Sequence, residues 1–290
     1  MTTEEVLIKI KRIEIKSKLL SKHLISGDYH TFFKGQGMSF SEVRNYQYGD
    51  EIRKIDWNVT ARYHHPFVKL FEEEREQNVF LLIDVSNSMF TGSKNSLKIN
   101  FLLELVAVLA FSAEWNKDKV SSVFFSSKIE KYFPPSLGKK HLLKILSSLI
   151  NQTTTNQGTN PEVAFDFLQK VIKKRSVVFV ISDFITDSSY FDSLRKFRRK
   201  HDVILIKIED VLDKQFPKIG KIQCNSVEFP YSFWIDTNDE TTQEMLSKAY
   251  TSNHIEWEDF LKKEKISFLT IENQSNYIPQ LINFFAQRRR

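Results

Sequence analysis

Oxygen-bearing side chains follow directly after an apolar run in the stretch FLLIDVSNSM, residues 80–89. The apolar part ends at Asp84, and the hydroxyls of Ser86 and Ser88 come at the next alternate positions. Carboxylates and hydroxyls are the ligand types that a hard cation such as Mg²⁺ prefers. The stretch therefore indicates either a metal-ligating turn or a polar turn that caps the next helix.

The capping alternative depends on where the next helix begins. The apolar segment that follows predicts a helix over 96–116, and Asn95 and Ser96 stand at its start. Because Asn and Ser are both favoured N-cap residues, they can cap this helix themselves. The metal interpretation of Ser86 and Ser88 is therefore favoured.

A second buried strand, predicted over 176–183, also ends in an aspartate, Asp183. Ligands of open α/β sheets lie beyond the carboxyl ends of the strands, where the direction of the connections reverses. If this strand lies beside the strand at 79–84, both aspartates face one crevice, and Thr159 in the polar loop 153–160 would overhang it. Two carboxylates and three hydroxyls predict a site for Mg²⁺, or for Mn²⁺ in its place.

An alternation of strands and helices from residue 78 onward must position these side chains. Continuous apolar runs predict buried strands, and helical spacing of apolar residues predicts the segments between them. The alternation implies parallel strands joined by right-handed helical crossovers. We expect strands at 79–84, 120–125, 128–133, 176–183, 202–210 and 266–271, and helices at 96–116, 138–150, 161–174, 188–200 and 277–289.

Turn and cap signals refine this scheme. Asn160 and Pro161 predict the N-cap and first position of the helix at 161–174. Residues 219–235 predict a hairpin, and Thr237 with Glu240 predicts a capping box for a long helix after it.

The first 76 residues follow a different pattern. Residues 3–25 predict an amphipathic helix, and the glycine-, aromatic- and charge-rich segment up to Glu76 predicts an irregular subdomain that includes a strand at 66–75. We expect an N-terminal part over 1–76 and a main α/β domain over 77–290 that carries a hairpin insertion near 217–236.

Composition limits the class of protein. The chain has 290 residues, of which 41% are hydrophobic, enough for a sizeable core. Its single cysteine, Cys224, favours a reducing compartment. The N-terminus lacks the apolar core of a signal peptide, and the longest apolar run, 101–111, is too short to span a bilayer. We expect a soluble, cytoplasmic protein without a membrane span.

The net charge of +6 comes with several basic clusters, such as residues 195–200. Solvated helix faces explain these clusters better than nucleic-acid binding, because the sequence contains no recognised nucleic-acid-binding module. A basic nucleic-acid-binding protein remains an alternative, and so does a metal-dependent hydrolase, although no general base is evident beyond Asp84 and Asp183. A third alternative is that the site is present but empty and that the fold serves only as a scaffold.

The residues of the proposed cation site carry a resemblance. DVSNS at 84–88 resembles the DxSxS motif of the metal-ion-dependent adhesion site of von Willebrand factor A-like domains, and Thr159 and Asp183 match its threonine and second aspartate in order and context. The resemblance implies a doubly wound, mostly parallel sheet flanked by helices. It also implies that the hydroxyls ligate the metal directly, that the aspartates act mainly through waters, and that a partner protein supplies an Asp or Glu carboxylate.

Residues 35–62 are similar to the hallmark of a bacterial family called domain of unknown function 58. The pattern GxG(M/L)xFxExRxYxxGDxxRxIDWxx(T/S)AR is met almost position by position from Gly35 to Arg62, and DVSNSM and VISDF extend the similarity. The resemblance implies partnership with a MoxR-type AAA+ ATPase in a chaperone-like or assembly role. We therefore expect a non-enzymatic, Mg²⁺-dependent protein-binding adaptor.

The same segment holds a second set of candidate residues. Arg53, Asp56 and Arg62 could form an ion-pair network with Glu42, and Trp57 would be its apolar anchor. The functional alternative is a site for a partner or an anion that uses Arg53 and Arg62.

Overall fold

The computed structural model describes residues 38–73, 77–93, 97–153, 158–214, 217–225, 232–273 and 275–288. They form two compact units, a smaller one that ends at Gln77 and a larger one that includes the chain from Asn78 onward. The predicted helix at 3–25 lies outside the described residues.

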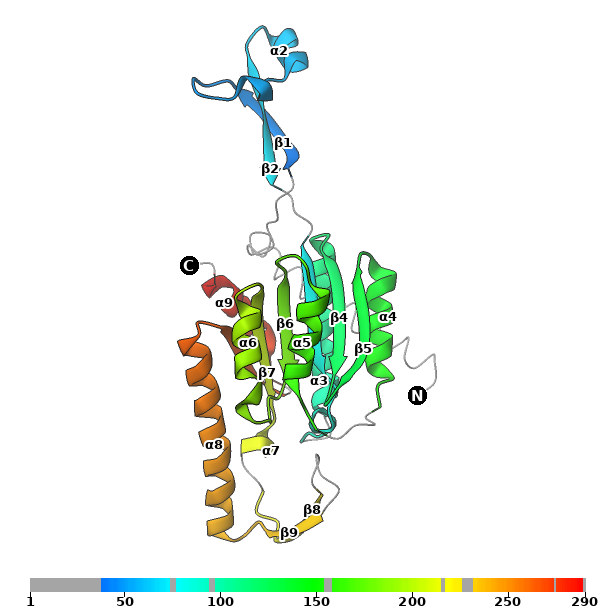
Figure 1. Cartoon of the computed structure of the whole chain (residues 1–290), viewed down its shortest axis with the longest axis vertical. Helices are drawn as coiled ribbons and strands as arrows, with labels where there is room; N and C mark the ends of the chain where they lie inside the picture. Colours follow the sequence, from blue (N-terminus) through cyan, green and yellow to red (C-terminus); the bar gives the residue numbers. More distant parts are fainter. Residues whose placement is uncertain are drawn as a thin grey trace. The chain divides into compact units, whose positions relative to one another are not determined.

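The larger unit is built on a six-stranded sheet with the order β10-β7-β6-β3-β4-β5 (Figure 1). Its strands pair in parallel except for β5, which pairs with β4 in antiparallel orientation. The strands are β3 (Asn78–Asp84), β4 (Lys119–Phe125), β5 (Ile129–Ser136), β6 (Val177–Ser182), β7 (Asp202–Glu209) and β10 (Ser267–Glu272). The predicted strands are therefore all present, within a few residues of their expected ends.

The direction of the connections reverses between β3 and β6, which are hydrogen-bonded neighbours. The chain leaves β3 toward β4 on one side and leaves β6 toward β7 on the other. This is the place in an open α/β sheet where ligands are bound, beyond the carboxyl ends of the strands. The structure thus meets the condition on which the predicted site depends.

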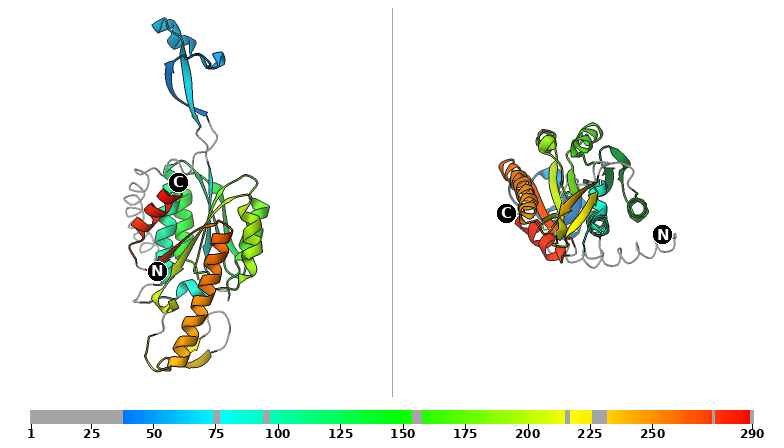
Figure 2. Two further views of the ribbon diagram at one scale, coloured as in Figure 1. Left: turned by 90° about the vertical axis from the view of Figure 1, so that its left-hand side faces the viewer. Right: turned by 90° about the horizontal axis from the view of Figure 1, so that it is seen from below.

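Helices cover both faces of this sheet (Figure 2). One face packs against α5 (Pro161–Val171), α6 (Phe191–Arg198) and α8 (Glu240–Lys263), through a core that includes Phe80, Phe165 and Trp257. The other face carries α3 (Lys98–Trp115), with α4 (Lys139–Ile150) beside it, and α9 (Tyr277–Gln287), whose Phe285 ring meets Phe179 of β6. Because both faces are covered, β3 and β6 are apolar along nearly their whole length.

Two helix starts differ from their predictions. Leu97, without a side-chain cap, precedes α3, and the expected caps Asn95 and Ser96 lie outside the described residues. Asp239 caps α8 by accepting a hydrogen bond from the backbone of Thr242, so the predicted Thr237 cap is wrong. The Thr237 hydroxyl instead donates to the carbonyl of Gly220 and closes the preceding hairpin. The predicted Asn160 cap of α5 is confirmed, with Pro161 as its first residue.

Short elements complete the larger unit. The predicted hairpin consists of β8 (Lys221–Asn225) and β9 (Ser232–Asp236), which pair in antiparallel orientation. Three further short helices are η3 (Asn87–Phe90), η4 (Ser188–Tyr190) and α7 (Val211–Lys214). No helix among the described residues combines the length and the apolar character needed to cross a bilayer.

The smaller unit is an antiparallel pair, β1 (Met38–Asn45) and β2 (Phe67–Glu73), joined through η2 (Ile52–Lys54) and α2 (Trp57–Tyr63). Arg44 and Asp50 form two hydrogen bonds of 2.7 Å that close the turn after β1. These two contacts hold the irregular loop to the strand pair.

Candidate functional site

Asp84 ends β3 and is fully buried. One carboxylate oxygen accepts a hydrogen bond of 2.8 Å from the backbone of Ser86, and the other accepts one of 2.5 Å from the Ser182 hydroxyl at the end of β6. Burial, together with the negative charge of Asp183, raises the pKa of Asp84 well above its ordinary value. A cation bound beside both carboxylates would offset the repulsion between them.

Ser86 and Ser88 are buried, and their hydroxyl oxygens lie 3.1 Å apart. Ser86 occupies the position before η3, but its side chain makes no capping hydrogen bond. The capping explanation for these two serines therefore finds no support in the contacts of η3. Their hydroxyls converge on each other at the end of β3 instead.

Asp183 follows β6 and is also buried. One of its oxygens accepts a hydrogen bond of 3.2 Å from the backbone of Ile185. The next residue, Phe184, has a φ of 51°, a left-handed conformation that is uncommon for a bulky side chain. Its backbone donates to the Ser182 hydroxyl, which fixes the turn that carries Asp183.

Thr159 lies at the same edge of the sheet, in the loop before α5. The backbone of its neighbour Asn160 donates to the carbonyl of Ser126 just after β4, and the Thr186 hydroxyl donates to the Thr159 carbonyl. The Thr159 hydroxyl itself is buried and has no hydrogen-bond partner among the described residues. Gly158, with a φ of 89°, supplies the left-handed backbone that this loop requires.

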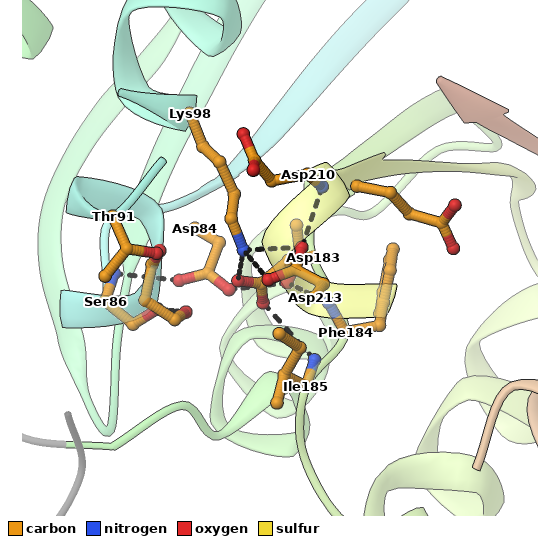
Figure 3. A network of polar contacts seen from close by, with 12 residues as sticks. Asp84, Ser86, Thr91, Lys98, Asp183, Phe184, Ile185, Asp210 and Asp213 are labelled. Carbon is orange, nitrogen blue, oxygen red and sulfur yellow. Dashed lines mark hydrogen bonds and ion pairs between the residues drawn. The ribbon is translucent and has the colours of Figure 1, made fainter. Parts of the chain in front are cut away.

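Lys98, the first residue of α3, reaches into this group of side chains (Figure 3). Only 1% of its surface is exposed, and its ammonium lies 3.0 Å from a carboxylate oxygen of Asp183 and 3.0 Å from Asp213 of α7. Burial alone would lower the pKa of Lys98, but Asp183 and Asp213 outweigh it and raise that pKa. The ammonium is therefore charged and pairs with the second aspartate of the predicted site.

Neither Lys98 nor Asp213 was expected from the sequence, although the sequence holds one signal for the lysine. A positive charge in the first turn of a helix faces the positive end of the helix dipole, which is unfavourable unless a carboxylate offsets it. A lysine that opens the apolar segment of α3 therefore indicates an acidic neighbour elsewhere in the fold. Its two partners are 85 and 115 residues away along the chain.

The donor set fits a hard cation in its chemistry. It offers two carboxylates from adjacent strands, two converging serine hydroxyls and the unpartnered hydroxyl of Thr159. Hydroxyls are essential to this set, because no group of three or more His, Cys, Asp or Glu side chains in the described ranges could hold a metal ion. Asp84, Ser86, Ser88, Thr159 and Asp183 would hold Mg²⁺, which could supply an open coordination position for an incoming carboxylate.

A pocket of about 600 Å³ adjoins this group. Asp213 lines the pocket and also pairs with Lys98, and Phe184 forms part of the wall. Aromatic side chains of α8, Tyr250 and Trp257, lie across from them, with Lys207 between the two rings at 5.2 and 5.3 Å. A pocket lined by aromatic and charged side chains thus lies next to the candidate site.

The second set of candidate residues lies in the smaller unit. Asp56 caps α2 and lies 3.5 Å from Lys69. Trp57, the first residue of α2, is 66% exposed, and its role as the apolar anchor of the network stays a prediction. Arg53 and Arg62 are exposed. Their use by a partner or an anion stays a prediction.

The sheet order, the mostly parallel strands and the helices on both faces define a doubly wound α/β protein. Among solved structures, similarity is found to BatB from Bacteroides thetaiotaomicron (13% identity, 73% of this chain and 98% of that chain, TM-score 0.45). It is also found to the SpRpn10 VWA domain (11% identity, 72% of this chain and 95% of that chain, TM-score 0.40).

A family profile described as "Protein of unknown function DUF58" matches residues 42–256, and the chain belongs to this family. An uncharacterized protein of Mycobacterium tuberculosis, Rv1480, is 23% identical over 285 residues, which cover 97% of this chain and 89% of that relative. The uncharacterized protein YeaD of Bacillus subtilis is 46% identical over 44 residues, 15% of this chain and 11% of its own length. The family that residues 35–62 indicated is thus confirmed.

Proposed function

We propose that this protein is a non-enzymatic adaptor that binds a protein partner through a Mg²⁺ ion held by Asp84, Ser86, Ser88, Thr159 and Asp183. The observation that supports this most directly is the placement of the two aspartates on neighbouring parallel strands at the point where the connections reverse. A cation there would accept a carboxylate from a partner's Asp or Glu side chain.

An adaptor is favoured over a hydrolase by the contacts of the polar side chains around the site. The hydroxyls of Ser86 and Ser88 lie against each other, and the Lys98 ammonium is fixed by two carboxylates. Among the described residues, the hydrogen bonds of these groups include none to a histidine that could act as a base for a nucleophile. Phosphatase and esterase assays with Mg²⁺ or Mn²⁺ should show no turnover above a metal-free control.

The partner proposed is a MoxR-type AAA+ ATPase, as the family resemblance implies, with a chaperone-like or assembly role for the pair. The pocket beside the site gives a partner segment a place to bury an apolar side chain next to the carboxylate that reaches the metal. Both contacts would have to form on the same face of the larger unit.

Calorimetric titration of Mg²⁺ into the metal-stripped protein tests the metal. The wild-type protein should release or absorb heat with one site per chain, and Asp84→Asn, which keeps the size of the side chain, should show none. Asp166→Asn, on the exposed side of α5, is the matched control and should behave as wild type. Equal heats for wild type and Asp84→Asn would overturn the metal assignment.

Capture from native lysate tests the partner. The wild-type protein should retain an AAA+ ATPase with Mg²⁺ and lose it with a chelator, and Asp84→Asn should fail to retain it in either condition. If the ATPase is retained equally with Mg²⁺ and with chelator, and equally by wild type and by Asp84→Asn, the partner binds elsewhere on the protein.

A further inference from the structure

Lys98 gives the candidate site a cation of its own. Its ammonium lies 3.0 Å from Asp183, and both side chains are 1% exposed. The same ammonium lies 3.0 Å from Asp213, whose side chain is 15% exposed. Two carboxylates, Asp183 and Asp213, therefore face one fixed positive charge at the carboxyl edge of β3 and β6 (Figure 3).

This ion pair differs from an ordinary surface salt bridge. Exposed pairs exchange freely with water and contribute little, whereas a buried ammonium needs its carboxylates because no water replaces them. The backbone also holds the pair in place: the Lys98 amide donates to the carbonyl of Thr91, and the Asp210 amide donates to Asp213. Lys98 therefore cannot leave Asp183 without leaving a buried charge unpaired.

A divalent ion at the predicted site would need the same carboxylate. Asp183 has one oxygen engaged by the Ile185 amide and the other by Lys98. A metal ion that binds Asp183 would lie close to the Lys98 ammonium, which already pairs with that carboxylate. Two cations on one buried carboxylate repel each other. The carboxylate oxygens of Asp84 instead accept hydrogen bonds from the Ser86 amide and the Ser182 hydroxyl.

We propose that Lys98 is a built-in competitor of the metal ion: its ammonium holds Asp183 in the place of a divalent cation and sets a low affinity for Mg²⁺. Metal binding then requires Lys98 to move from Asp183 toward Asp213. A further interaction that favours this exchange, such as a partner's carboxylate on the metal, would raise the Mg²⁺ affinity of the wild-type protein. The inference rests on the proposed metal site and specifies what controls its occupancy.

Lys98 could instead position Asp183 for the metal ion, and the direction of the change in Mg²⁺ affinity on removing its charge distinguishes the two roles. If Lys98 instead positioned Asp183 for the metal, removing its charge would weaken Mg²⁺ binding. If it competes, removing its charge strengthens Mg²⁺ binding. The two roles predict opposite changes from the same substitution.

Calorimetric titration of Mg²⁺ into the metal-stripped full chain measures this change directly. Lys98→Met should bind Mg²⁺ at least about tenfold more tightly than the wild-type protein, a change of 1.4 kcal/mol. Lys207→Met is the matched control, since Lys207 is also a buried lysine, paired with Glu209 on β7, and does not contact Asp183; it should keep wild-type affinity. Affinity of Lys98→Met equal to or weaker than wild type would overturn the proposal.

A second variant tests the proposal in case Lys98→Met does not fold. It also leaves the net charge unchanged, so that any gain in affinity comes from loss of the Lys98 contact. Lys98→Met combined with Asp213→Asn removes one positive and one negative charge and leaves no unpaired Asp213, so it should fold and still bind Mg²⁺ more tightly than wild type. If either variant binds Mg²⁺ tightly and the wild-type protein shows no binding, Lys98 competes with the metal ion, and the claim that the free wild-type protein binds Mg²⁺ is refuted. Binding by wild type without any gain in the variants would refute the competition alone, and no binding by any of them would refute both.

Discussion

The hydroxyl of Thr159 is the candidate ligand whose contribution to metal binding can be separated from folding. It is buried without a hydrogen-bond partner in the described part of the chain. Thr159→Val keeps the shape and removes an unsatisfied group, so the free energy of unfolding without Mg²⁺ should stay unchanged or rise by up to about 1 kcal/mol. The Mg²⁺ affinity of the same variant should fall by about tenfold, as calorimetry would measure.

Thr186→Val is the control for this substitution. Its hydroxyl donates to the carbonyl of Thr159 at 3.2 Å but is not a proposed ligand. This variant should lose about 1 kcal/mol of stability and keep its Mg²⁺ affinity. Equal metal affinity in Thr159→Val and wild type would remove Thr159 from the ligand set.

At the scale of residues, the sequence predicted the aspartates at the strand ends but did not predict the charged side chains that α3 and α7 bring to the site. Asp84 and Asp183 are recognisable because each follows a continuous apolar run, and parallel strands bring their carboxyl ends to one edge. Lys98 and Asp213 carry no such local mark. Their contact depends on how α3 and α7 pack, and the spacing of residues does not specify that.

At the scale of elements, the Glu209 side chain at the end of β7 contacts side chains of two helices, α7 and α8. It pairs with Lys214 of α7 at 2.8 Å and with Lys207 of its own strand at 3.1 Å, and it accepts a hydrogen bond from the Tyr250 hydroxyl of α8. Burial would raise the pKa of Glu209, but these three partners lower it to about 2. The ionised carboxylate therefore stabilises the contact between the edge of the sheet and α7 and α8.

This contact should depend on pH in one direction. The unfolded carboxyl has its ordinary value of 4.5, so above that pH the stabilisation is complete, and it is lost as the pH falls toward 2. Glu209→Gln should lower the free energy of unfolding by about 2 kcal/mol at pH 7, after allowance for the partly exposed Lys214. The difference from wild type should shrink steadily below pH 4.5.

Urea unfolding of both proteins across this pH range measures the effect. Glu272→Gln is the control, because Glu272 lies opposite Glu209 on β10 and is exposed. It should change the free energy of unfolding little at any pH. A constant difference between Glu209→Gln and wild type from pH 7 to pH 3 would contradict the assignment.

The elements show why boundaries are harder to predict than strands. Apolar runs long enough to be buried on both sides identified β3, β6 and β7. The start of α8 was misplaced because Thr237 and Asp239 are both acceptable caps, and the hairpin before the helix decides between them by using the Thr237 hydroxyl. The four-residue α7 is too short to show a helical period at all.

At the scale of the whole molecule, the division into two units separates the metal site from the family's most recognisable segment. All five proposed ligands and Lys98 belong to the unit that begins at Asn78, whereas Arg53, Trp57 and Arg62 belong to the smaller unit. Where the structure describes its side chains, the smaller unit has few that are buried, and it exposes Tyr48, Ile52 and Trp57. A ligand that binds one unit should therefore stabilise that unit without stabilising the other.

Hydrogen exchange of the full chain, read separately for each unit, checks this expectation. At a free Mg²⁺ concentration of about 100 times its Kd, the amides of β3, β6 and α3 that exchange through global opening should gain about 2.7 kcal/mol of protection. The amides of β1 and β2 should gain none, because their unit supplies no proposed ligand. Asp84→Asn should abolish the gain in the larger unit, and Lys98→Met should reach it at a lower Mg²⁺ concentration than wild type. Equal gains in β1 and β3 would show that Mg²⁺ acts on both units, and the assignment of its site to the carboxyl edge of the sheet would then be wrong.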